Sequence, residues 1–185
     1  MAKENNIISG EWTTLDLNQN KDWLIELNKT DKEELIQATD LAIKSKKNLY
    51  DITKREFGLN EFLKKIEQIK TQILNGYGFV VLKNLPITQF NDEEVKIMLW
   101  GLGQYIGYPE KQDKAGSLLH VVTDTGANFA KSDHIRGFQT NEELQFHTDG
   151  ADVFALLCIR NAKSGGLSKL VSSVAIFKEI EKTRP

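Results

Sequence analysis

The residues with the clearest potential for chemistry are His147 and Asp149, within the stretch LQFHTDG at positions 144–150. On an extended strand, residues i and i+2 point to the same face, so the imidazole and the carboxylate would converge. One histidine and one carboxylate are two-thirds of the 2-His-1-carboxylate set that holds Fe(II) in non-heme oxygenases. A His-x-Asp spacing also arises by chance, and a solvated surface pair is the alternative interpretation.

The sequence around this pair extends the pattern. The stretch from Arg136 to Val174 joins F-H-T-D to a following apolar run and to the turn S-G-G-L-S. In this combination it resembles the taurine dioxygenase-like (TauD/TfdA) family of Fe(II)/2-oxoglutarate-dependent oxygenases. The stretches GYGFVVLKNLP (76–86) and WGLGQYIG (100–107) are also similar. The resemblance covers most of the chain beyond about Asn60, and the N-terminal helices more weakly.

The resemblance implies roles for individual residues. His147 and Asp149 match the family's first two iron ligands, and an aspartate at position 149 argues against the related halogenases, which leave that ligand position open. Ser168 falls where the family often has a hydroxyl that helps to hold a carboxylate of 2-oxoglutarate. An ordinary strand serine is the alternative for Ser168.

Polar residues that precede the His-x-Asp pair are candidates for substrate contact. By analogy with the family, Arg136, Gln139 and Thr140 could line the pocket of the primary substrate, although a polar surface loop has the same composition. The other two histidines are expected to lie away from the metal. His134 is in a polar loop, and His120 is interpreted as a strand histidine with its own hydrogen bonds.

One departure from the family pattern concerns the third ligand. The family has a further histidine well downstream, followed by an arginine that pairs with 2-oxoglutarate, whereas no histidine follows Asp149 here. The resemblance therefore predicts a C-terminally truncated chain that lacks part of its site. Taken alone, such a chain is expected to be inactive.

Composition and charge exclude several other classes of protein. The chain has 185 residues and 24 basic against 26 acidic side chains, so it has no general field to attract nucleic acid or an anionic membrane. A single cysteine, Cys158, excludes an internal disulfide and a cysteine-based zinc site, and its apolar surroundings predict burial. The N-terminus has no apolar signal region, which predicts a cytoplasmic protein.

Apolar periodicity predicts helices in the first half of the chain. One is expected from a capping box at Thr30 and Glu33 to about Lys46. A second is expected over 60–75 and a third after Asn91, with a buried strand over 79–82 between them. Further on, Ser172 or Ser173 can cap a short helix.

Beyond Leu118 the pattern changes to short strand-like runs: LLHVV, GFQ, LQFHTD, VFALLCIR and SKLVSSV. The expected fold class is α+β with a mainly β core, an incomplete double-stranded β-helix (jelly roll, cupin-like) with N-terminal helices packed outside. We expect a single domain over 1–185, with a helix-rich front (1–110) and the first part of the jelly roll (111–185).

The resulting expectation is an Fe(II)/2-oxoglutarate-dependent dioxygenase. It would hydroxylate or oxidatively cleave a small molecule, using O2 and releasing succinate and CO2. The alternative is an inactive fragment or a non-catalytic jelly-roll binding module. A homo-oligomer is left open, and neither nucleic acid nor membrane is expected as a partner.

Overall fold

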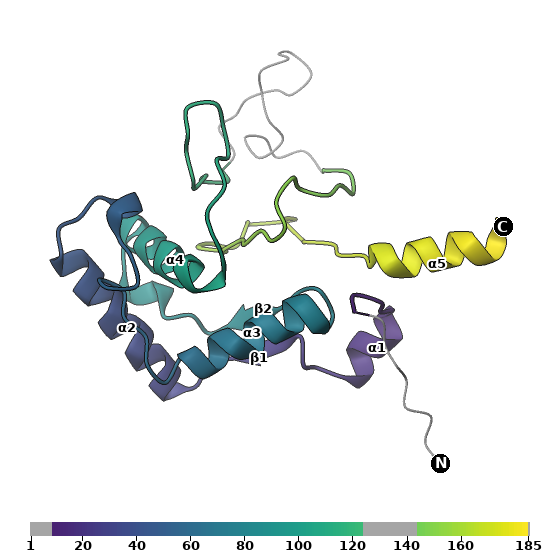
Figure 1. The fold of residues 1–185 in the computed structure, drawn as a ribbon, viewed down its shortest axis with the longest axis horizontal. Helices are drawn as coiled ribbons and strands as arrows, with labels where there is room; N and C mark the ends of the chain where they lie inside the picture. The colour runs from purple at the N-terminus through teal and green to yellow at the C-terminus, as the bar shows by residue number, and fades with distance from the viewer. Residues whose placement is uncertain (1–8, 124–143, 185) are drawn as a thin grey trace. The chain divides into compact units, whose positions relative to one another are not determined.

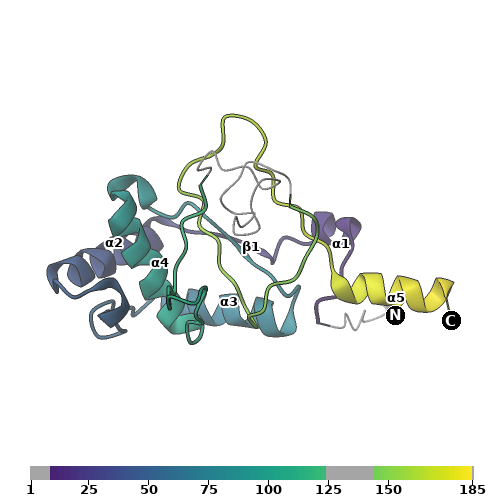
Figure 2. The same cartoon turned by 90° about the horizontal axis from the view of Figure 1, so that it is seen from above.

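Two helices, α2 (Lys29–Lys44) and α4 (Asp92–Ile106), pack side by side and form the centre of the core (Figures 1 and 2). Each turns an apolar stripe inward, as the sequence periodicity predicted. The structure is a computed structural model that describes residues 9–123 and 144–184. The buried apolar side chains of these two helices include Leu35, Ala38, Ala42, Val95, Met98 and Leu102.

The chain divides into two compact units. The first comprises Met1–Gly107 together with Cys158–Pro185, and the second comprises Tyr108–Leu157. In the first unit the other elements are α1 (Thr14–Gln19), β1 (Leu24–Glu26), η1 (Leu49–Asp51), α3 (Leu63–Asn75), β2 (Val81–Lys83), η2 (Ile87–Gln89) and α5 (Ser173–Thr183). The second unit contains no helix or strand among its described residues.

The predicted helices form, with shifted starts. The N-cap of α2 is Asn28, whose side chain accepts from the Asp31 N–H, so the predicted cap at Thr30 is wrong. The capping box that forms is Asn28 with Asp31, and it starts the helix two residues earlier than predicted, about half a turn. The predicted cap of α4 at Asn91 is confirmed, as is that of α5 at Ser172.

Helix α3 begins at Leu63, three residues later than predicted. The N–H groups that precede it donate to a side chain from another helix, because the Glu34 carboxylate accepts from the backbone of Asn60 and of Phe62. This carboxylate thus binds the N-cap N–H and one backbone N–H two residues before it. The start of α3 is therefore fixed by a tertiary contact that local sequence does not reveal.

The strands differ most from expectation. Strand β2 pairs in parallel with β1, and Ile25 faces Leu82 in the register. The predicted strand at 79–82 is shifted to Val81–Lys83 and is not buried, because Val81 and Lys83 are exposed. This two-stranded sheet is the only one in the described residues, and the strands expected over 118–122, 144–149, 153–160 and 168–174 are not formed there. A mainly β core is therefore not what the described residues show, and a jelly roll is not confirmed.

Aromatic residues join the sheet to the N-terminal segment. The Phe79 ring lies 5.2 Å from that of Trp12 and 5.7 Å from that of Trp23, measured between ring centroids. The Trp12 indole donates to the carbonyl of Tyr77 at 2.8 Å. Tilted pairs of this kind add to the stabilisation from burial alone. These contacts fix residues 9–12 beside the end of α3.

A close approach in the core gives a first prediction. A Cβ on Gly101 of α4 would lie 2.3 Å from Cγ of Phe57, whose ring is fully buried, whereas a Cβ on Gly103 would meet nothing within 4 Å. Gly101→Ala should lower the free energy of unfolding by about 1–3 kcal/mol through overpacking. Gly103→Ala, the matched control, should raise it by up to about 1 kcal/mol through helix propensity. Urea unfolding of both variants checks this, and equal effects would contradict it.

A second prediction concerns acid stability. The Glu56 carboxylate accepts from the Lys47 ammonium at 2.7 Å and from the Thr53 hydroxyl and N–H, which lowers its pKa from 4.5 to about 2. A carboxyl with a depressed pKa stabilises the fold above its unfolded value and loses that contribution as the pH falls. The stability difference between wild type and Glu56→Gln should therefore shrink between pH 4.5 and pH 2. Lys47→Met should reduce the change in the free energy of unfolding over the same pH range, because it removes the ammonium that binds Glu56. If the free energies of unfolding of wild type and Glu56→Gln change with pH in parallel, the prediction is wrong.

Candidate functional site

His147 and Asp149 lie in the second unit on an irregular stretch of chain, and both side chains are exposed. The expected strand is absent over 144–150, so strand geometry does not place the His147 and Asp149 side chains on one face. Nδ1 of His147 lies 2.7 Å from the carbonyl oxygen of Gln145. Because a carbonyl only accepts, Nδ1 is the nitrogen that carries the proton in this contact, and Nε2 keeps its lone pair.

This arrangement can be tested against the needs of an iron site. Metal-binding histidines usually donate their second N–H to a carbonyl or carboxylate, which fixes the tautomer, and the contact of His147 with Gln145 has that form. An imidazole nitrogen and a carboxylate oxygen are also ligands that suit Fe(II). Within residues 9–123 and 144–184, however, no group of three His, Cys, Asp or Glu side chains could hold a metal ion. The described residues therefore contain no complete iron site, and His147 and Asp149 are candidate ligands by residue type.

The remaining sequence candidates are distributed as follows. Arg136, Gln139, Thr140 and His134 lie outside the described residues. His120, also in the second unit, has its Nε2 3.5 Å from Oδ2 of Asp113. The Ser117 N–H donates to the same carboxyl group at 3.0 Å and, with the Ser117 side chain, lowers the pKa of Asp113. His120 thus lies beside a local turn, and the strand that the sequence predicted around it is not formed.

Ser168 is in the first unit, on an exposed segment that follows a glycine turn. Gly165 and Gly166 have φ of 74° and 71°, a left-handed conformation that favours glycine. These φ values are compatible with the predicted glycine turn, whereas the strand predicted after it is not formed. Cys158, which the sequence places in a buried run, is exposed. Its neighbours on that run have no sheet to cover them in the described structure.

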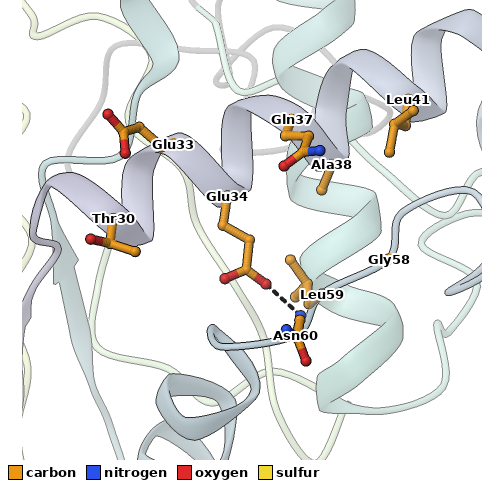
Figure 3. Close-up of a pocket in the computed structure, with 9 residues that line it drawn as sticks. All are labelled: Thr30, Glu33, Glu34, Gln37, Ala38, Leu41, Gly58, Leu59 and Asn60. Carbon is orange, nitrogen blue, oxygen red and sulfur yellow. Dashed lines mark hydrogen bonds between the residues drawn. The ribbon is translucent and has the colours of Figure 1, made fainter.

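A cleft of about 460 Å³ lies between α2 and the loop 58–60 (Figure 3). Its wall on α2 carries two adjacent carboxylates. Figure 3 shows the Glu34 carboxylate reaching toward Asn60. The dashed line marks the hydrogen bond that the backbone N–H of Asn60 donates to this carboxylate. Glu33 is exposed and makes an ion pair with Lys29 at 3.7 Å. Both carboxylates thus have structural partners, and the cleft is a gap between packed elements.

Sequence reasoning missed one pair of residues. The Arg160 guanidinium donates two hydrogen bonds to the Asp92 carboxylate, of 2.9 Å from Nη1 and 2.7 Å from Nη2. This contact lowers the pKa of Asp92 and raises that of Arg160. No functional role was predicted for Arg160 from the sequence. The available signal was its type, since only four of the 24 basic residues are arginines and arginine suits two-pronged binding of a carboxylate.

Comparison with known proteins defines the class. Residues 44–185, more than half of the chain, match the sequence model of the family described as "Taurine catabolism dioxygenase TauD, TfdA family". The chain therefore belongs to the TauD/TfdA family, as the motifs around His147 predicted. Membership implies an Fe(II)/2-oxoglutarate-dependent, oxygenase-like function and a cupin-like fold.

Two curated relatives are similar over much of the chain. FR-33289 synthase from Streptomyces rubellomurinus is 25% identical over 174 residues, which are 94% of this chain and 51% of that protein. Taurine hydroxylase-like protein SAT17 from Stachybotrys chartarum is 27% identical over 135 residues, 70% of this chain and 35% of that protein. The chain thus spans about half of the first relative and about a third of the second.

No helix in the described part of the chain is long and apolar enough to cross a membrane.

Proposed function

We propose that this chain is the ligand-bearing front part of an Fe(II)/2-oxoglutarate-dependent dioxygenase. In the proposal, His147 and Asp149 supply two iron ligands and Ser168 contacts 2-oxoglutarate. The observation that carries it is the His-x-Asp pair in a chain of this family, with Nδ1 of His147 held by a backbone carbonyl so that Nε2 is available. The reaction would hydroxylate or oxidatively cleave a small molecule and release succinate and CO2.

Each side chain would have a distinct task. Iron with 2-oxoglutarate and O2 supplies the oxidising power for attack on a C–H bond. Nε2 of His147 would bind the metal as a neutral donor, while the Gln145 carbonyl keeps the ring in one tautomer. Asp149 would contribute negative charge, and the Ser168 hydroxyl would donate a hydrogen bond to a carboxylate of the cosubstrate.

The proposal extends to the domain and its substrate. We propose one jelly-roll domain over 1–185, helix-rich to about 110, in which the apolar runs after 111 become strands when partner strands pair with them. Arg136, Gln139 and Thr140, which lie outside the described residues, would contact the primary substrate. The relatives' names indicate small molecules, and a small organic molecule is the substrate class proposed here.

The second candidate is a chain without activity of its own, either an inactive fragment or a jelly-roll binding module. One observation favours it. The described residues contain no three-membered set of metal-binding side chains. Two ligands hold a transition metal much more weakly than three, so this candidate predicts no stable iron complex.

The third prediction distinguishes these candidates by metal binding. Anaerobic Fe(II) with 2-oxoglutarate should give a weak visible charge-transfer band in the full reading frame that contains this chain. His147→Ala or Asp149→Ala should abolish the band because each removes a ligand. His120→Ala is the matched control and should retain it. A band that survives His147→Ala would show that this histidine is not a ligand, and a protein with no band at all would support the second candidate.

The fourth prediction tests Ser168. Loss of a neutral hydrogen bond costs about 0.5–1.5 kcal/mol, so Ser168→Ala should raise the KM for 2-oxoglutarate roughly two- to twelvefold. Iron affinity should remain unchanged, because the hydroxyl is not proposed as a ligand. Ser164→Ala, an exposed serine on the other side of the glycine turn, is the control. If both variants keep the wild-type KM, Ser168 has no role in cosubstrate binding.

A further inference from the structure

The segment between Arg160 and Ser172 is exposed along its length and is held at both ends. Every residue from 161 to 171 is exposed. At one end Arg160 binds Asp92, and at the other Ser172 binds the carbonyl of Gly10. All of these residues belong to the first unit. Residues 161–171 thus form a surface loop with a contact to the front of the chain at each end, and we call it the Gly-Gly loop.

The first contact is a two-pronged ion pair. Nη1 and Nη2 of Arg160 each bind a different oxygen of Asp92, at 2.9 Å and 2.7 Å. Such a pair fixes the orientation of the guanidinium as well as its distance, which a lysine ammonium cannot do. Asp92 is the first residue of α4, the helix that carries the centre of the core. The loop is therefore attached to the start of a helix that carries buried core residues.

The second contact is buried. Ser172 is 4% exposed, its hydroxyl donates to the carbonyl of Gly10, and the same oxygen accepts from the Ala175 N–H at 3.0 Å. It therefore caps α5 and ties the start of this helix to the N-terminal segment. An ion pair between Lys178 and Glu11 joins the same two segments. This end of the loop is thus fixed to the N-terminal segment, and the Arg160–Asp92 pair anchors the other end.

The loop carries the residue that matters for the proposed chemistry. Gly165 and Gly166, both with positive φ, lie between the two contacts, and Ser168 is two residues beyond Gly166. A hydroxyl on an exposed loop contributes to ligand binding only where the loop is pre-organised, since otherwise the cost of ordering it is subtracted from the bond. The two end contacts supply that order.

We propose that Arg160 is a positioning residue which, through Asp92, holds the Gly-Gly loop so that Ser168 meets 2-oxoglutarate. The inference rests on the proposed function, because it takes the cosubstrate role of Ser168 from there. It assigns to the Arg160–Asp92 pair an effect on cosubstrate binding without contact with the cosubstrate or the metal.

The first experiment measures the loop directly in the 185-residue chain. Lys163 and Lys169 lie on the loop, so native-state digestion with a lysine-specific endopeptidase reports how often it opens. Arg160→Gln and Asp92→Asn should each speed cleavage at these sites about two- to fivefold, the range for a solvent-exposed ion pair. Arg55→Gln, which removes another exposed arginine, is the control and should not change the rate. Wild-type rates in both loop variants would overturn the proposal.

Charge reversal tests whether the pair itself is responsible. Asp92→Arg and Arg160→Asp should each speed cleavage, and the double variant should return most of the way to wild type. The single Asp92→Arg variant measures the separate cost of a positive charge at a helix start. A double variant as fast as the sum of the two single variants would show that the contact does not hold the loop.

The last experiment links the loop to the cosubstrate. In the Mn(II)-loaded full reading frame, Arg160→Gln should weaken 2-oxoglutarate binding about two- to fivefold and leave Mn(II) affinity unchanged, with Arg160→Lys in between. In a Ser168→Ala background Arg160→Gln should have no further effect, and an additive effect would overturn the positioning role. If the wild type does not bind 2-oxoglutarate, the proposed function and the positioning role both fail, whereas the digestion results still decide whether the pair holds the loop.

Discussion

The packing of α2 against α4 is the constraint on which the rest of the described structure depends. Every buried apolar side chain in the described residues lies between Trp12 and Leu102, and the largest of them, including Phe57 and Phe62, surround these two helices. Burial of apolar surface at roughly 25 cal/mol per Å² is the main source of stability in such a unit. The approach of Phe57 to Gly101 shows how tightly it is filled. Because the core ends at residue 102, later segments must be held in other ways.

Polar contacts hold those later segments. Residues 158–184 belong to the first unit, yet α5 buries no side chain, and Phe177 is 62% exposed. What fixes this part is the Arg160–Asp92 pair, the Ser172 hydroxyl and the Lys178–Glu11 pair. Exposed ion pairs are weak and are screened by salt, so this part of the unit is more easily opened than the helical core. The S-G-G-L-S stretch at 164–168, which is part of the family resemblance, thus lies on a segment that these polar contacts hold in place.

The helices could be predicted from sequence because their determinants are local. The cap at Asn91 and the stripe through Val95 and Met98 lie within α4 itself, and both are confirmed. The start of α3 could not be predicted, since Glu34 from α2 accepts from the backbone N–H groups of Asn60 and Phe62 just before the helix. A strand needs the N–H and C=O groups of a partner, and a pattern such as VFALLCI indicates only that a residue run is suited to pairing. In the described structure no strand pairs with that run, and its sequence does not say where a partner would come from.

The candidate site divides in the same way. Residue types and spacing were enough to propose His147 and Asp149 as metal ligands, because ligand chemistry is a property of the side chains themselves. Their convergence is not a local property: the same-face argument required a strand, and residues 144–150 are irregular. The contact that sets the tautomer of His147 is local, since its partner Gln145 is two residues away, and in the proposed iron site it would not require a strand. Metal binding and strand pairing would then be coupled, because each orders the same stretch and the free energy of one reduces the ordering cost of the other.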